Sequence, residues 1–294
     1  MGTERGLSGG TVRARAPGST SNIGPGFDVL GLALDLHVEV EVVDAPRLVV
    51  RTEGEGADLP QDASHLAARV AIEVRGHDRL AVTVRSRIPV GRGLGSSAAL
   101  AAAAAAAAGA ADPLAVATRH DGHGENAAAS VVGGLVAAPL VSGSPVVRRL
   151  PLDARLAFVV LVPDRHLATK DARGVLPTSV PFDDAVANLG RLVLLVSGLA
   201  DASTLERVAG EDRLHQRARS ALFPEAPELL DRLERAGAVV ACWSGAGPSL
   251  LAICRSGADA PAVRDAGECA LADLGIAGRA IELRPDITGL VVEP

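Results

Sequence analysis

The stretch that most constrains this chain runs from Pro89 to Ala111, where a glycine-rich loop leads directly into a run of alanines. Gly91, Gly93 and Gly95 give the loop a backbone that can turn tightly and come close to another group. This spacing predicts a loop with a defined shape, followed by a firm helix. It leaves open whether the loop approaches a ligand or only another part of the chain.

Alanine is the strongest helix former, so residues 98–111 predict a helix that ends around Gly109 and the following Asp112-Pro113. Ser96 or Ser97 is expected to cap its start, because a serine oxygen can accept the free N–H groups of the first turn. A helix start with free N–H groups and the positive end of the dipole favours an anion, most often a phosphate. The alternative is an ordinary capped loop before a buried helix.

Two common phosphate loops are excluded. The Walker loop needs a lysine after its last glycine, and the only lysine of this chain, Lys170, lies far away. The dinucleotide fingerprint needs the spacing Gly-x-Gly-x-x-Gly, which Gly91, Gly93 and Gly95 do not give.

Composition narrows the class of protein. A chain of 294 residues predicts two domains with a sizeable core. Apolar residues make up 48% but aromatic residues only 2%, so the core must consist mainly of Ala, Val and Leu. The scarcity of aromatic rings, the net charge of −6 and the pI of about 5.7 argue against nucleic-acid binding.

The cysteines, the start of the sequence and the alanine run do not indicate a secreted or a membrane protein. Cys242, Cys254 and Cys269 lack metal-binding spacing and are expected to be reduced core thiols. The start of the sequence has no apolar signal core and residues 1–10 look loose, so a cytoplasmic protein is expected. The alanine run is too short and too weakly apolar to span a bilayer, so no membrane partner is expected.

Hydrophobic periodicity predicts a mixed chain of strands and helices, and Pro151 is the expected boundary between domains 1–150 and 151–294. The Gly- and Pro-rich residues 17–28 are expected to form a loop. The predicted strands are 11–16, 36–43, 47–52, 79–86, 155–162, 238–243, 249–254, 279–283 and 290–293. The predicted helices are 63–75, 98–111, a short one from Pro113, 183–199 and 260–274.

The phosphate loop resembles the second motif of the GHMP kinases, a family named for galactokinase, homoserine kinase, mevalonate kinase and phosphomevalonate kinase. In that family Pro-x-x-x-Gly-Leu-Gly-Ser-Ser-Ala wraps the phosphates of ATP, and the match here has no gap. The resemblance implies that ATP is the cofactor and that it is bound by Pro89, Val90, Gly91, Arg92, Gly93, Leu94, Gly95, Ser96, Ser97, Ala98 and Ala99.

Residues 17–28 resemble the first motif of the family in the form found in its homoserine kinase branch. Gly18 replaces an alanine there, and the six-residue step from Asn22 to Asp28 is kept. Residues 121–126, Asp-Gly-His-Gly-Glu-Asn, resemble the Glu-Gly-His-Pro-Asp-Asn block of the same branch, with His123 and Asn126 kept.

The second half carries further blocks of the same branch. Residues 163–177 resemble a segment with Ser-Thr-x-x-Ala-Arg, which places Thr169 and Arg173. Residues 212–219 resemble Asp-Arg-Leu-His-Gln-Pro-Tyr-Arg, which ends here at Arg219. Asn-Leu-Gly-Arg at 188–191 is also typical, and the glycine loop 244–248 resembles the third motif of the family, which lies against the active site.

The resemblance implies an α+β fold of two domains, an N-terminal ATP-binding domain and a C-terminal ferredoxin-like domain. It implies phosphorylation of the hydroxyl of L-homoserine by ATP, a step toward threonine. In this interpretation Arg173 and Arg219 bind the substrate carboxylate and Asp28 binds its ammonium group. The catalytic set is Asn22, His123, Asn126 and Thr169, and no dedicated base is assigned.

The expected Mg²⁺ site is where this sequence departs most from the pattern of the family. The family uses a loop serine and a glutamate from the helix before the His block, but Pro113–His120 contains no carboxylate. Ser97 and Asp121 are the expected ligands, with Glu125 next in line.

Two alternatives stay open: another small-molecule kinase of the family, and a non-catalytic sensor that binds ATP on the same fold. The expected partners are L-homoserine and ATP, with a homodimer left open.

Overall fold

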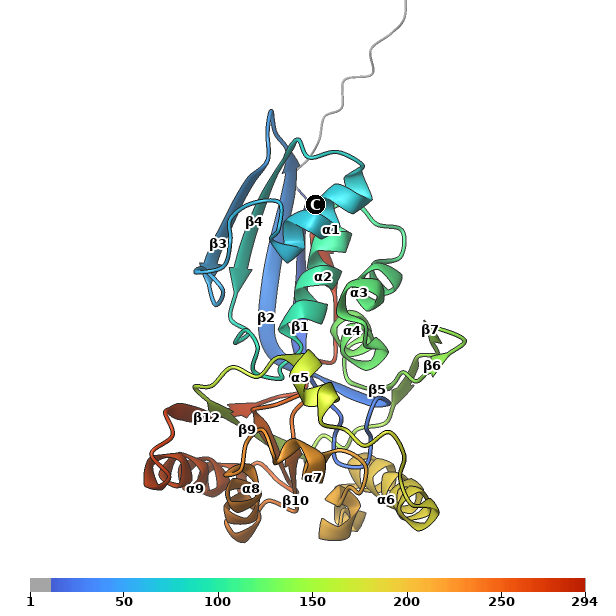
Figure 1. Cartoon of the computed structure of the whole chain (residues 1–294), viewed down its shortest axis with the longest axis vertical. Coiled ribbons are helices and arrows are strands. Elements are labelled where there is room, and N and C mark those ends of the chain that lie inside the picture. Colours follow the sequence, from blue (N-terminus) through green and yellow to red (C-terminus); the bar gives the residue numbers. More distant parts are fainter. Residues whose placement is uncertain (1–11, 294) are drawn as a thin grey trace, which may run out of the picture.

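The computed structural model describes residues 12–293, so the predicted loose segment 1–10 lies outside the described residues. The chain forms two stacked halves, each a sheet with helices on it (Figure 1). The helix α5 (Thr169–Gly174) lies between the two halves in this view.

The first half is built on a seven-stranded sheet, whose main path runs β13-β1-β2-β4-β3, while β5 and β8 extend from β2. Strands β1 and β2 pair antiparallel along their lengths, and β3 runs parallel to β4. The strands are β1 (Val12–Ser21), β2 (Leu30–Asp44), β3 (Val49–Gly54), β4 (Leu80–Ser86), β5 (Leu135–Ala137), β8 (Arg148–Leu150) and β13 (Val291–Glu293). A separate small hairpin joins β6 (Leu140–Val141) and β7 (Ser144–Pro145).

Strand β1 is longer than predicted, because residues 17–21 continue it instead of starting the loop. The register shifts between Pro17 and Gly18, and such an irregularity lets a proline and a glycine fit inside a sheet. The prediction of a loop is correct from Asn22 onward. The consequence is that Ser19, Thr20 and Ser21 are rigid strand residues at the edge of the site.

Four helices cover one face of this sheet (Figure 1). The alanine helix α2 is nearly all buried, between β1 and β2 on one side and its neighbouring helices on the other. Because alanine side chains are small, helix and sheet can approach closely without a gap. The helices are α1 (Leu66–Arg75), α2 (Ser96–Ala107), α3 (Pro113–Asp121) and α4 (Gly124–Val132).

The start and the end of α2 differ from the prediction. Gly95 is the N-cap residue, with φ of 63°, and no side chain caps the helix. The expectation that Ser96 or Ser97 caps it is therefore wrong: both lie inside the first turn. The helix ends at Ala107, two residues before Gly109, which has φ of 88°.

The second half has a four-stranded antiparallel sheet in the order β10-β11-β9-β12. Helices α8 and α9 pack on it, and α6 lies at the other side of this half (Figure 1). The last strand of the described chain, β13, returns to the first sheet, where it pairs with β1. The boundary at residue 151 stays a prediction. The elements are β9 (Ala157–Pro163), α6 (Phe182–Ala200), α7 (Gln216–Arg219), α8 (Ala226–Arg235), β10 (Val240–Trp243), β11 (Leu250–Cys254), α9 (Ala260–Asp273) and β12 (Gly278–Leu283), with single 3₁₀ turns at Ala202–Thr204 and Arg207–Gly210.

Cys242 and Cys254 are buried as predicted, and burial raises the pKa of both thiols to about 12. Cys269 is exposed on α9, so the prediction of a core thiol is wrong there. Between residues 12 and 293 there is no helix with the length and apolar character that crossing a membrane requires.

Candidate active site

The end of β1 and two glycine loops meet where the two halves touch. The Ser19 N–H donates to the Leu94 carbonyl at 3.0 Å, which fastens the end of β1 to the glycine loop. The Ser244 hydroxyl donates to the Gly93 carbonyl at 2.7 Å. The Gly245 N–H donates to the Ser21 carbonyl at 2.8 Å. The loop at 244–248 therefore lies against the site, as the sequence predicted.

The glycine loop is shaped by contacts that only glycine allows. Gly91, Gly93 and Gly95 all have φ between 63° and 74°, a region that L side chains rarely adopt. A Cβ on Gly95 would collide with the hydroxyl of Ser19, and one on Gly93 would collide with the Ser244 carbonyl. The loop thus holds one shape in front of the first turn of α2.

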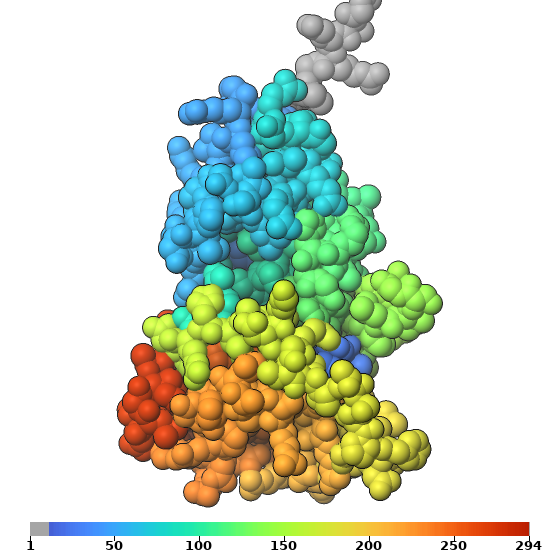
Figure 2. Space-filling view, in the orientation of Figure 1, coloured from blue at the N-terminus to red at the C-terminus, as the bar shows by residue number. Residues whose placement is uncertain are grey.

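A cleft of about 370 Å³ opens over this loop and is bordered by both halves. Figure 2 shows a recess between the blue-to-cyan upper part and the yellow-green segment around residue 170. Most predicted site residues line the cleft: Asn22, Val90, Gly91, Arg92, Gly93, Leu94, Gly95, Ser96, Ser97, Asp121, His123, Asn126, Thr169, Arg173 and Arg219.

Four predicted residues are not part of that lining. Ala98 and Ala99 are buried inside α2. Pro89 borders a smaller neighbouring hollow. Asp28 lies behind Arg173, whose guanidinium it binds.

A chain of polar contacts runs across the floor of the cleft. The Ser97 hydroxyl donates to Asp121 Oδ1 at 2.5 Å. His123 Nδ1 lies 2.9 Å from the Asp121 carbonyl, so this nitrogen carries the proton and Nε2 can accept from Arg173 Nε at 2.9 Å. Arg173 Nη2 in turn donates to Asp28 Oδ1 at 2.6 Å. Predicted site residues from four separate blocks of the sequence are therefore joined by hydrogen bonds.

The two predicted arginines converge on one aromatic ring. The guanidinium carbons of Arg173 and Arg219 lie 5.6 Å and 5.4 Å from the centre of the Phe27 ring. Arg219 is only 2% exposed, and burial lowers its pKa to about 10, so it stays charged at neutral pH. Its Nε has no hydrogen-bond partner among the described residues. Arg219 Nη1 donates to the Gly245 carbonyl at 2.7 Å, but no carboxylate of the described residues pairs with this guanidinium. A buried cation beside a cleft favours an anionic ligand.

The loop between the two substrate-motif residues is strained. Asn22 and Asp28 both have positive φ, 57° and 55°. The Asn22 side-chain oxygen accepts from the Asp28 N–H at 2.9 Å and closes the loop on itself. Asn126 accepts from the Ser19 hydroxyl at 3.0 Å and faces the same end of the cleft.

Comparisons with known proteins agree with this geometry. Residues 63–134 match the family profile "GHMP kinases N terminal domain", and residues 194–273 match "GHMP kinases C terminal". A homoserine kinase of Streptomyces avermitilis is 41% identical, covering 87% of this chain and 90% of its own. One of Moorella thermoacetica is 36% identical, covering 95% of this chain and 98% of its own.

The chain belongs to the homoserine kinases of the GHMP family.

Solved structures give the same result. The crystal structure of a homoserine kinase from Cytophaga hutchinsonii matches with a TM-score of 0.84 and 27% identity, covering all of both chains. A mevalonate kinase of L. major, at 15% identity and a TM-score of 0.65, shares the fold alone. The predicted two-domain α+β fold of the GHMP kinases is therefore confirmed.

The residues predicted to bind Mg²⁺ suit a hard cation. Asp121 Oδ2 is buried and without a hydrogen-bond partner in the part of the chain described, and the Ser97 oxygen lies beside the other carboxylate oxygen. Mg²⁺ prefers oxygen ligands and usually takes one or two from the protein. The described residues contain no group of three or more His, Cys, Asp or Glu side chains that could hold a metal by themselves, so water and phosphate oxygens would complete the shell of an ion bound here.

Sequence reasoning undervalued Glu125. This carboxyl is 2% exposed and lines the cleft beside Asn126. Burial is the main reason that its pKa is raised to about 7, and Asp28 and Asp121 add to the shift. Its position next to Asn126 in the sequence could have indicated that Glu125 belongs to the site, but its burial could not be predicted from the sequence.

His65 is a second cleft residue that the sequence motifs did not indicate. It lines the far end of the cleft, where its Nδ1 accepts from the Ala67 N–H at 3.3 Å and caps α1. Its Nε2 lies 3.3 Å from the Thr52 hydroxyl, and burial lowers its pKa. The ring is therefore neutral and held in one orientation by these two contacts.

Proposed function

We propose that this protein transfers the terminal phosphoryl group of ATP to the side-chain hydroxyl of L-homoserine, giving O-phospho-L-homoserine for threonine biosynthesis. The observation that carries the proposal is the pairing of two features across one cleft. A rigid loop of glycine amides lies on one side. Two guanidinium groups beside a carboxylate lie on the other.

Kinases of this family use ATP, and we assign its phosphates to the loop 91–97. The N–H groups of the loop and of the first turn of α2 are unpaired within the helix and carry the positive end of its dipole. We assign the adenine ring of ATP to the apolar end of the cleft, which includes Val84, Leu66 and Leu100, with His65 as the polar group at its edge. Apolar walls with few polar groups are typical of such subsites.

We assign L-homoserine to the guanidinium end. A zwitterionic amino acid carries one carboxylate and one ammonium group. In the structure Arg173 and Asp28 bind each other. When homoserine binds, its carboxylate can replace Asp28 as the partner of Arg173, and its ammonium group can replace Arg173 as the partner of Asp28. Arg219, which lacks a partner for Nε among residues 12–293, would add a second donor for the carboxylate.

Alignment of the hydroxyl is the remaining task. Phosphoryl transfer depends mainly on positioning and charge neutralisation. We assign this to Asn22, Asn126, His123 and Thr169, which border the space between the loop and the arginines. No side chain is assigned as a dedicated base, so the proton of the hydroxyl would pass to the transferred phosphate.

Ser97 and Asp121 are the side chains proposed to hold Mg²⁺. When bound, the ion would neutralise charge on the phosphates of ATP. Asp121 Oδ2 and the Ser97 hydroxyl lie at the start of α2, where those phosphates are assigned. The cytoplasmic location and the homodimer stay predictions.

Product analysis tests this function directly. The purified protein, ATP, Mg²⁺ and a panel of small alcohols, with homoserine and mevalonate among them, are assayed for ADP release and for the phosphorylated product. Homoserine is expected to be turned over best, since mevalonate has no ammonium group for Asp28. Preference for mevalonate would favour another kinase activity. ATP binding without turnover of any alcohol would favour the sensor.

A further inference from the structure

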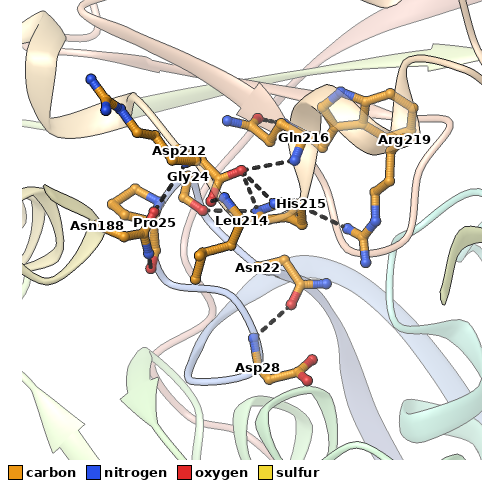
Figure 3. Close-up of polar contacts among 12 residues, drawn as sticks. Asn22, Gly24, Pro25, Asp28, Asn188, Asp212, Leu214, His215, Gln216 and Arg219 are labelled. Carbon is orange, nitrogen blue, oxygen red and sulfur yellow. Dashed lines mark hydrogen bonds and ion pairs between the residues drawn. The ribbon is translucent and has the colours of Figure 1, made fainter. Parts of the chain in front are cut away.

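Several residues of the second half contact the strained loop Asn22–Asp28 but have no part in the chemistry proposed above. Figure 3 shows them gathered on one side of the loop, with His215 between Gly24 and Arg219. They come from the two blocks Asn188–Arg191 and Asp212–Arg219, of which only Arg219 has so far been given a role.

His215 joins the loop to the buried arginine. Its side chain is fully buried, its Nε2 lies 2.9 Å from the Gly24 carbonyl, and its Nδ1 lies 3.1 Å from Arg219 Nη1. A carbonyl can only accept and a guanidinium can only donate. The ring must therefore carry its proton on Nε2 and present the lone pair of Nδ1 to Arg219.

The ring is neutral, which the two contacts require. The pKa of His215 is lowered to about 4, mainly by burial and also by Arg219, while the carboxylates of Asp212 and Asp28 oppose the shift. The ring also stacks on Phe27, with centroids 4.9 Å apart. His215 thus contacts the loop at the Gly24 carbonyl and at the Phe27 ring, and it also contacts Arg219.

Asp212 fixes the turn that presents His215. One carboxylate oxygen accepts from the N–H groups of His215 and Gln216, both at 2.8 Å, and the other accepts from that of Leu214 at 3.0 Å. The carboxylate side chain is fully buried. The backbone before α7 is therefore held by three hydrogen bonds to one side chain.

Asn188 supports the loop from a different helix, α6. Its amide nitrogen donates to the Pro25 carbonyl at 3.0 Å, and its amide oxygen accepts from the Arg213 N–H at 3.2 Å. One side chain therefore bridges the substrate loop and the segment that carries His215.

Such support has a physical purpose in this loop. Asn22 and Asp28 both have positive φ, a conformation that is unfavourable for an L-residue and persists only when its surroundings enforce it. Gly24 and Pro25 lie between them, and their carbonyls are the two groups that His215 and Asn188 hold.

We propose that His215 and Asn188 are positioning residues, which set the Asn22–Asp28 loop and Arg219 in the arrangement that binds the amino-acid substrate. The proposal rests on the proposed function, because the substrate it concerns is L-homoserine. Neither side chain is assigned a contact with ATP.

Two substitutions separate the two contacts of His215. In His215→Gln the amide nitrogen reaches the place of Nε2 and keeps the bond to Gly24, whereas the acceptor for Arg219 is lost. In His215→Asn the amide oxygen takes the place of Nδ1 and keeps the bond to Arg219, whereas the donor for Gly24 is lost. Both are expected to raise the KM for homoserine by about tenfold or more and to leave that for ATP within about twofold.

The same assay includes Asn188→Asp and a control. Asn188→Asp keeps the acceptor for Arg213 but cannot donate to Pro25, so it should raise the homoserine KM in the same selective way. Phe223→Leu is the control, because Phe223 is fully buried in a core cluster of the second half that contains no residue of the loop. It should lower the melting temperature without changing either KM.

The outcomes are distinguishable. A wild-type protein that does not phosphorylate homoserine would refute the proposed function itself. An active wild type whose His215 and Asn188 variants behave like Phe223→Leu, or raise both KM values together, would overturn the positioning role. If a His215 variant does not fold, Asn188→Asp decides by the same criterion.

Discussion

The two sides of the cleft are built in different ways. The side that we assign to the phosphates of ATP is made of backbone: three glycines and the start of an alanine helix, all within a single stretch of sequence. The side that we assign to L-homoserine is made of side chains from distant parts of the chain, such as Asp28, His123 and Arg173, linked by hydrogen bonds.

This difference affects how each side tolerates change. A backbone site fails when any side chain intrudes on it, because its shape depends on close packing. A site of charged side chains loses affinity for one ligand group at a time, because each residue contributes a separate contact. The predictions below test this contrast.

The largest effect is expected from Gly95→Ala. The new Cβ would collide with the Ser19 hydroxyl at a backbone φ of 63°. ATP affinity, measured by calorimetry, should fall by at least about a hundredfold. Gly109→Ala is the matched control at the other end of the same helix region, since its φ is also positive but its Cβ would meet open space. Equal losses in both variants would show that strain alone, not the shape of the phosphate loop, is responsible.

The next largest effect is expected from Arg219→Ala. Loss of a charge-assisted contact to the carboxylate should raise the homoserine KM by about a hundredfold while the ATP KM stays unchanged. Arg217→Ala, an exposed arginine on the same short helix, should change neither. A parallel rise in both KM values for Arg219→Ala would count against a contrast between the two sides.

A smaller and more selective effect is expected from Asp28→Asn. It removes the partner proposed for the ammonium group and should raise the homoserine KM by about tenfold. The internal control is 4-hydroxybutyrate, which has the carboxylate and the hydroxyl but no amino group. The wild type should prefer homoserine, and the variant should lose much of that preference. Full discrimination in the variant would remove Asp28 from ammonium recognition.

The last effect is expected on the pH dependence of stability and not on ligand affinity, from Glu125→Gln. Because burial raises the pKa of Glu125 to about 7 in the folded protein, the folded state holds a proton that the unfolded state releases near its ordinary value of 4.5. The stability that this carboxyl contributes is therefore full below about pH 4.5 and is lost as the pH rises to about 7, by up to about 3 kcal/mol.

Urea unfolding at pH 5 and pH 7.5 measures this change. Glu125→Gln should reduce the loss of stability between the two pH values, whereas Glu268→Gln, at an exposed position on α9, should not. An unchanged pH dependence in Glu125→Gln would mean that this carboxyl ionises as readily in the folded protein as in the unfolded chain.

The same contrast explains what could be predicted from the sequence. The glycine loop and α2 depend on local preferences, so both were predicted, and only the two ends of the helix differ. At its start the left-handed Gly95 took the position expected for a serine, and the Ser97 hydroxyl turned to Asp121. The extension of β1 through Pro17 was missed because it depends on a register shift against β2.

For the side chains of the site, the sequence indicated which residues belong to it but not how they contact one another. Motif resemblance indicated Arg173, His123 and Asp28, but not that they bind one another, since Arg173 lies 50 residues from His123 and 145 from Asp28. The support by Asn188 and His215 was missed for the same reason. Contacts over such separations depend on the packing of the two halves, which no local pattern encodes.

The return of β13 to the first sheet has a mechanical consequence. The chain passes between the halves once after β8 and again between β12 and β13, so the second half is tethered at two points. Two tethers define an axis, and any opening of the cleft would be a rotation about the line that joins them. A fragment that ends after β12 would lack β13, which is the edge strand of the sheet in the ATP-binding half. Neither half can therefore be separated from the other by a single cut in the chain.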